Sequence, residues 1–317
     1  MIRDLSFSVV FGIASICILY LTVPGANNPV GSANAFQTLA LMTLSTLPLF
    51  LSGLGFGLAN VSISVLTAVV FAAIVINPIF GVTYVLTCGL PIVFLVRQAL
   101  LWREDESKVN WYPASNLMVC WVLVCIALSS MALILLYMDD ELRTAVIRLC
   151  ELMLEQVHKQ SGLKVVMTAE ELVWLMPQFF GPIWGVVLLL SGSLAQGILV
   201  RFKKNVRPTP EFSGFMLPLW MAIIAILGLV LSFVLEQINP FLGAIIVALE
   251  IAFFLQGMAV IHKVSVSWSY RSLVLTAVYL IVILMFWPAL VIALLGLVDS
   301  WIGFRSRLPA APDQEED

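Results

Sequence analysis

An acidic side chain, Glu250, lies near the centre of the apolar stretch FLGAIIVALEIAFFLQGMAVIH, residues 241–262. A charge at the centre of a bilayer costs about 2.5–3.5 kcal/mol on insertion scales, so such an acid faces the interior of a helix bundle, a cavity or a partner group. Two interpretations stay open. Glu250 either contacts a ligand or forms a proton-linked site, or it is protonated and hydrogen-bonds a serine or a backbone carbonyl to hold two helices together.

Two amide side chains lie on either side of this acid. Gln256 follows it by six residues, which turns the amide to a different face of a helix. Amides in apolar helices commonly join neighbouring helices by hydrogen bonds. Asn239 precedes Pro240 and is typical of a turn between two apolar segments. We take Glu250, Gln256 and Asn239 as the candidate ligand-binding residues.

Catalytic patterns are absent from the sequence. It has no HExxH, no Walker loop, no GxSxG and no paired-carboxylate motif. The two histidines, His158 and His262, lie far apart, and the expected topology puts them on opposite sides of the membrane. The sequence therefore predicts no enzyme, no metal site and no cofactor, and any ATP-driven work would require another subunit.

The composition is that of a membrane protein. Of the 317 residues 61% are hydrophobic and 11% are charged, whereas soluble domains carry roughly 45–50% apolar and about 25% charged residues. The net charge of −3 is small, and no basic stretch is long or aromatic enough to indicate a nucleic-acid partner, so none is expected. The bilayer is the expected partner, and the expected fold class is all-α, a polytopic transmembrane helical bundle.

Apolar runs of about 20 residues predict about nine spanning helices, within a range of eight to ten. They cover residues 5–23, 37–58, 61–77, 79–99, 116–137, 178–200, 214–235, 241–261 and 271–297. The chain is thus expected to be one integral membrane domain, 1–317. Glycines and prolines punctuate residues 37–99, which should form a compact helical unit whose broken turns are satisfied by neighbouring helices.

One sizeable insert, residues 138–176, separates two of these spans. Its apolar residues follow the helical period of 3.6: Leu142, Val146, Leu149, Met153 and Val157. A capping box at Thr168 and Glu171 opens a second helix, which is expected to stop at Pro177. The two helices either lie as an amphipathic pair on the membrane surface or form an ordinary loop packed on the bundle.

Lysines and arginines gather in loops 97–113, 201–212 and 262–271, which places these loops and the N-terminus in the cytoplasm and the 138–176 insert in the periplasm. Residues 271–304 are too long for one span, and Pro288 could divide them into two short arms. Asp299, Trp301 and Arg305 would then lie at the cytoplasmic interface, with a disordered acidic tail over 308–317. A single straight span remains the alternative.

The end of the chain resembles the YybS-like family of predicted bacterial membrane proteins of unknown function. The matching positions are Asn239, the segment from Gly257 to His262, and a closing segment with Gly296, Leu297, Asp299, Trp301, Phe304 and Arg305. The resemblance implies a multi-pass protein of the bacterial inner membrane.

Residues 37–99 resemble, more loosely, the first half of energy-coupling-factor transporter S components. That resemblance implies capture of a small solute and docking on an ATP-driven coupling module. The first span carries Ser8-x-x-x-Gly12 where S components have two alanines spaced by four. The leading hypothesis is therefore a small-solute binding or transport protein, and the alternative is a non-transport membrane scaffold or biogenesis factor that acts through protein or lipid partners.

Overall fold

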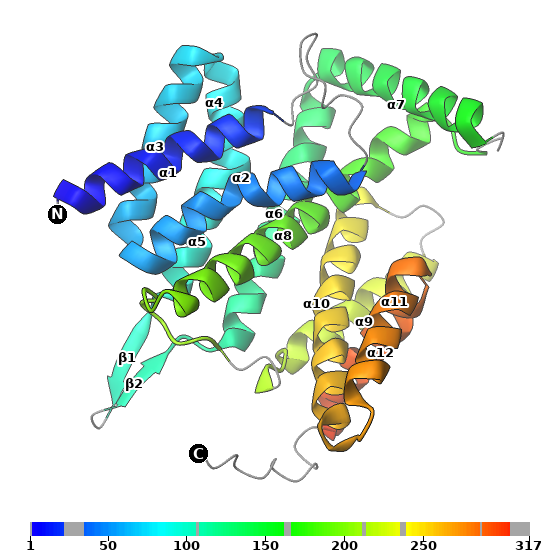
Figure 1. Cartoon of the computed structure of the whole chain (residues 1–317). Helices are drawn as coiled ribbons and strands as arrows, with labels where there is room; N and C mark the ends of the chain where they lie inside the picture. The colour runs from blue at the N-terminus through cyan, green and yellow to red at the C-terminus, as the bar shows by residue number, and fades with distance from the viewer. Residues whose placement is uncertain are drawn as a thin grey trace. The chain divides into compact units, whose positions relative to one another are not determined.

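The computed structural model describes residues 2–21, 35–105, 108–161, 166–210, 214–234, 239–285 and 287–304. Apart from one short β-hairpin, the regular structure in these ranges is helical (Figure 1). Arg305 and the acidic tail lie outside the described residues. The chain divides into two compact units, and helix α8 (Ala169–Arg201) contributes its first part to unit 2 and its second part to unit 1.

Unit 1 comprises Met1–Pro113 and Ile183–Pro210. Its helices are α1 (Ile2–Tyr20), α2 (Ala35–Phe56), α3 (Leu58–Val75), α4 (Pro78–Tyr84) and α5 (Leu90–Ala99), with the second part of α8. Turns separate α2 from α3 and α3 from α4, where the sequence predicts them. Gly57, between α2 and α3, has φ +93°, a conformation that favours glycine. Asn77 caps α4 by accepting a hydrogen bond from Phe80 N at 2.7 Å, and Pro78 occupies the first turn.

A proline inside the α4–α5 segment leaves one backbone carbonyl without its usual helical donor, and a side chain of a neighbouring helix donates to that carbonyl. Val85–Gly89 form a wider π-helical turn just before Pro91, which has no N–H to donate to the carbonyl of Thr87 four residues earlier. That carbonyl accepts a hydrogen bond from Trp184 Nε1 on α8 instead, at 2.7 Å. At this one break a neighbouring helix thus satisfies the backbone, in agreement with the expectation for residues 37–99.

The loop after α5 contains a hairpin that the all-α prediction missed. Strand β1 (Trp102–Asp105) pairs antiparallel with β2 (Lys108–Trp111), so that Trp102 is opposite Trp111. Arg207 anchors it: Nη1 donates to the carbonyl of Ala99 at 2.9 Å and Nη2 to that of Tyr112 at 2.7 Å. Burial lowers the pKa of the Arg207 guanidinium, and its carbonyl partner Ala99 is the last residue of α5, where a cation is favoured.

Unit 2 comprises Ala114–Pro182 and Glu211–Asp317. Its helices are α6 (Ala114–Met138), α7 (Asp140–Ser161), the first part of α8, α9 (Leu219–Val234), α10 (Pro240–Val264), α11 (Arg271–Leu284) and α12 (Pro288–Ile302), with a short 3₁₀ turn, η4 (Ser265–Ser267), after α10. Figure 1 shows α9 to α12 gathered beside one another. Within this group, α12 packs along α10.

Helix α8 does not stop at Pro177, so the predicted end of the second insert helix is wrong. The helix continues through Pro177 and Pro182 to Arg201. Pro182 leaves the carbonyl of Gln178 without its usual donor, and Ser129 Oγ on α6 lies 3.4 Å from that carbonyl while accepting from Gly181 N at 3.1 Å. A serine on the adjacent helix thus allows the proline to be tolerated inside α8.

The long apolar run at the end of the chain is divided at Pro288, as the sequence indicates. Helix α11 ends at Leu284, and α12 begins at Pro288 in the first helical turn. Helices of 14 and 15 residues reach only about 21–23 Å at 1.5 Å per residue, less than the hydrocarbon core of about 30 Å.

Six helices of the described chain are long and apolar enough to cross a membrane. They are α2, α3, the α4–α5 segment, α6, α8 and α10; α1, α9, α11 and α12 are apolar but shorter. The protein is therefore a multi-pass helical membrane protein. The predicted number of about nine spans stays a prediction.

The carbonyl of Thr87 gives a test of this packing. Trp184→Phe keeps an aromatic ring but removes the N–H, and we expect the free energy of unfolding to fall by about 1 kcal/mol because a partly buried carbonyl loses its donor. In a Pro91→Ala background the same substitution should lower the free energy of unfolding by less, because the alanine supplies a backbone N–H that can donate to this carbonyl. Thermal unfolding in detergent would measure both, with exposed Trp220→Phe as the control. Equal losses with and without Pro91 would contradict this account.

Candidate functional site

Glu250 lies on the face of α10 that packs against other helices of unit 2. Ile246, Glu250, Phe253 and Gly257 are spaced by four, three and four residues, so they share one side of the helix. Ile246 contacts Gly228 of α9, and the backbones of Phe253 and Gly257 contact α12. Glu250, which is itself partly buried, therefore lies toward the packed side of α10, the most buried of the candidate spans.

The carboxylate of Glu250 is partly buried. Within the described residues no hydrogen bond or ion pair joins it to another side chain or to a carbonyl. Nothing in this part of the chain thus fulfils the packing interpretation of Glu250, in which a serine or carbonyl binds the protonated acid. The arrangement leaves the carboxyl group able to contact a solute, a water molecule or a proton.

Gln256 has the opposite character, because its hydrogen bonds are made within the protein. Its side chain is fully buried. Oε1 accepts from the backbone N–H of Leu217, just before α9, at 2.8 Å, and Nε2 donates to the carbonyl of Gly296 on α12 at 2.9 Å. Nε2 also lies 3.1 Å from Ser300 Oγ and 3.3 Å from Asp299 Oδ2. Gln256 therefore joins α10 to α12 and to the backbone segment that precedes α9.

The structure separates the three candidate ligand-binding residues. Glu250 and Gln256 lie on different faces of α10, as their spacing predicts. Asn239 caps the start of the same helix, with its side-chain oxygen accepting from Phe241 N at 2.9 Å. Of the three, Glu250 alone has a polar group that is neither capping a helix nor bonded to a neighbouring helix within the described residues.

Asp299 and Trp301, expected together at the membrane interface, have different surroundings. Asp299 is fully buried in α12 beside Gln256, whereas Trp301 is about half exposed. The third member of that set, Arg305, lies outside the described residues. Sequence spacing does not indicate that Asp299 and Gln256 meet, because they are 43 positions apart.

Two glycines bring α10 and α12 into close contact. A methyl group on Gly257 would overlap the carbonyl of Ile292, and one on Gly296 would overlap the carbonyl of Phe253. Small residues of this kind let helix backbones approach closely in membranes. The two segments quoted for the family resemblance, which begin at Gly257 and Gly296, therefore pack on each other. Their role in packing could not be read from either segment alone.

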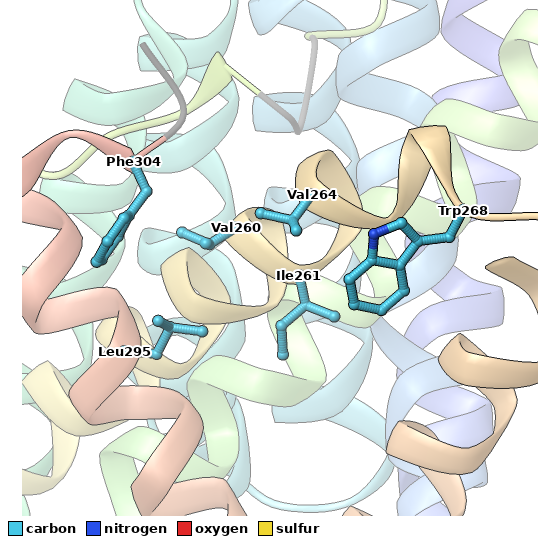
Figure 2. A pocket seen from close by; sticks show the side chains of 6 residues that line it. All are labelled: Val260, Ile261, Val264, Trp268, Leu295 and Phe304. Carbon is cyan, nitrogen blue, oxygen red and sulfur yellow. The ribbon is translucent and has the colours of Figure 1, made fainter. Parts of the chain in front are cut away.

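A pocket of about 310 Å³ lies at the end of the same pair of helices. Figure 2 shows its lining, which is apolar apart from the indole nitrogen of Trp268: Val260, Ile261 and Val264 from α10, Trp268 after η4, and Leu295 and Phe304 from α12 and its end. Val260 is ten residues beyond Glu250, about 15 Å along the helix. The carboxylate of Glu250 consequently does not line this pocket, which suits an apolar group.

The described residues contain no group of three or more His, Cys, Asp or Glu side chains placed to hold a metal ion. His262 contacts Tyr279 of α11, with Nε2 2.8 Å from the hydroxyl.

The small-residue face of α1 is used inside unit 1. Ser8 Oγ donates to Asn60 Oδ1 at 2.9 Å, and a methyl group on Gly12 would overlap the carbonyl of Ser64. Ser15 and Tyr84 share a hydrogen bond of 2.6 Å. The Ser8-x-x-x-Gly12 face therefore packs on α3.

The glycine contact between α10 and α12 can be tested by adding one methyl group. Gly257→Ala should lower the free energy of unfolding by about 1–3 kcal/mol, because the methyl group forces α12 away from α10. Gly197→Ala in α8 is the matched control, since nothing lies within 4 Å of the added methyl group, and there the change should be neutral or slightly stabilising. Similar melting temperatures for both variants would contradict the close packing.

Comparison with known families and structures agrees with the membrane architecture. A family model described as "Predicted membrane protein (DUF2232)" matches residues 34–300. No curated protein and no solved structure matches the chain. Since the family match spans the helices from α2 to α12, the chain belongs to the family of predicted membrane proteins DUF2232.

Proposed function

We propose that this membrane protein binds or transports a small solute through unit 2, with the carboxyl group of Glu250 as its polar contact. A single observation carries the proposal. An ionisable side chain lies midway along an apolar candidate span, on the side that packs against α9 and α12, and has no partner among the described residues. Ionisable residues at such depth mark solute or proton sites in membrane proteins.

The contrast with Gln256 supports a functional role over a packing role. Both polar side chains belong to α10, but Gln256 is fully buried and bonded to two neighbouring segments, the backbone before α9 and helix α12. A residue retained for packing is expected to be satisfied in this way. A partly exposed carboxyl group that is left unsatisfied destabilises the bundle, so a ligand or a proton gives a reason for its presence.

The location and orientation form part of the same proposal. We place the protein in the bacterial inner membrane with the N-terminus in the cytoplasm. The basic residues that follow α5, α8 and α10 would then share the cytoplasmic side, in keeping with the positive-inside rule. The apolar α11 and α12 would go out and return as two short arms. The looser resemblance of residues 37–99 to S components favours solute capture as the activity.

Native mass spectrometry of the full-length protein, purified in mild detergent from its own host, tests the role of Glu250. We expect a discrete small molecule to remain bound, and Glu250→Gln to weaken its binding by roughly tenfold or more, because a charge-assisted hydrogen bond contributes about 1.5–3 kcal/mol. Glu170→Gln, in the exposed first turn of α8, is the control and should bind normally.

Stability separates the proposal from a packing role. Glu250→Leu should abolish binding yet leave the melting temperature unchanged or higher, because it removes an unsatisfied polar group from an apolar helix. A clear loss of stability in Glu250→Leu, together with an unchanged ligand in Glu250→Gln, would show that the residue serves packing and would end the proposal.

A further inference from the structure

The apolar surface of helix α7 has one part that packs against the protein and another part that is exposed. The covered part includes Cys150, which is fully buried and whose Sγ lies 3.6 Å from Met176 Sδ of α8. The uncovered part is a stripe of Leu142, Leu149 and Met153, spaced by seven and four residues and 38%, 58% and 52% exposed. The stripe runs beside the surface that contacts α8. The apolar face of α7 is therefore wider than the part that α8 covers.

The opposite face of α7 is charged. Glu151 and Glu155 are exposed there, and Lys159 Nζ bonds Glu155 Oε2 at 3.3 Å. Arg148, one residue before Leu149, also faces away from the stripe. A helix with one apolar and one charged face is suited to a boundary between hydrocarbon and water.

The position of α7 along the chain places it at such a boundary. It begins two residues after the end of candidate span α6, and the corner is held by Asp139, whose Oδ1 accepts from Leu142 N at 2.9 Å. Figure 1 shows α7 turning steeply away from α6 instead of continuing it. Since α6 has the length and hydropathy to cross a bilayer, α7 starts where the chain leaves it.

A cluster of aromatic rings lies at the end of α6 where α7 begins, and it gives separate support for a membrane boundary there. The Tyr137 ring, at the end of α6, lies 4.6 Å from that of Trp174 on α8 and 6.4 Å from that of Phe241 at the start of α10, measured between ring centroids. Three candidate spans thus bring aromatic rings together at the end next to α7. Tyrosine and tryptophan are enriched at the membrane–water interface, where their rings sit at the level of the lipid headgroups.

We infer that α7 lies along the surface of the bilayer, with the stripe of Leu142, Leu149 and Met153 in contact with lipid and the Glu151–Glu155 face in water. Its 22 residues cover about 33 Å of membrane surface. The apolar stripe, and not charge, would hold the helix there, because acidic residues outnumber basic ones on its polar face. This surface is separate from the Glu250 site and does not depend on the proposed function.

Spin labels on the full-length protein in phosphatidylcholine nanodiscs test this inference. Labels are attached through Leu149→Cys and Met153→Cys on the stripe and, as matched controls, through Arg148→Cys and Glu151→Cys on the charged face. All four are made in a Cys17→Ser background, because Cys17 is the exposed native cysteine of the described chain. Collision rates with oxygen, which partitions into lipid, and with a water-soluble nickel chelate are then compared.

We expect the oxygen-to-nickel ratio to be roughly ten times higher at positions 149 and 153 than at 148 and 151, because an apolar face is buried about 5–10 Å into the headgroup boundary. Equal, water-like ratios at all four positions would overturn the inference, and so would low collision rates with both reagents at 149 and 153, which would mean that a second copy or another protein covers the stripe. Retained thermal unfolding of each labelled variant shows that the fold is intact.

Discussion

Hydrocarbon offers no hydrogen-bonding partner to a backbone N–H or C=O group, so each interruption of an apolar helix has to be satisfied by the protein itself. The arrangement of helices within each unit follows from this constraint. In unit 1, the indole of Trp184 binds the carbonyl that Pro91 leaves open, and in unit 2 Ser129 does the same beside Pro182. Gln256 extends the principle to the backbone before α9, where it accepts a hydrogen bond from the N–H of Leu217.

Much of this fold could be predicted because apolar run length and turn residues act locally. The breaks at Gly57, Asn77 and Pro288 coincide with sequence features that disfavour a continuous helix. The continuation of α8 past Pro177 and through Pro182 could not be predicted, because the carbonyl that Pro182 leaves without a donor lies against a serine on α6, 49 positions away in the sequence. The β-hairpin was missed for a similar reason: Arg207, over 90 positions away, holds both of its ends.

The candidate site also has features that the sequence predicts and features that it does not. The sequence favoured a position of Glu250 toward the bundle interior, a cavity or a partner group, because a charge at the centre of a bilayer is costly elsewhere. The pairing of Gln256 with Asp299 did not follow, because two glycines on separate helices set the distance between α10 and α12. Those two glycines lie 39 positions apart in the sequence, so their contact could be seen only once the two helices were placed side by side.

The central claim is that Glu250 faces a solute path inside the bundle. Modification of Glu250→Cys by a membrane-impermeant thiol reagent, in native membranes and in the Cys17→Ser background, tests it most directly. Ala259→Cys, at a fully buried position of the same helix, is the control and should not react. We predict modification of the introduced thiol at position 250 from at least one side of the membrane. Reaction only with a lipid-soluble reagent would place this side chain against hydrocarbon and contradict the account.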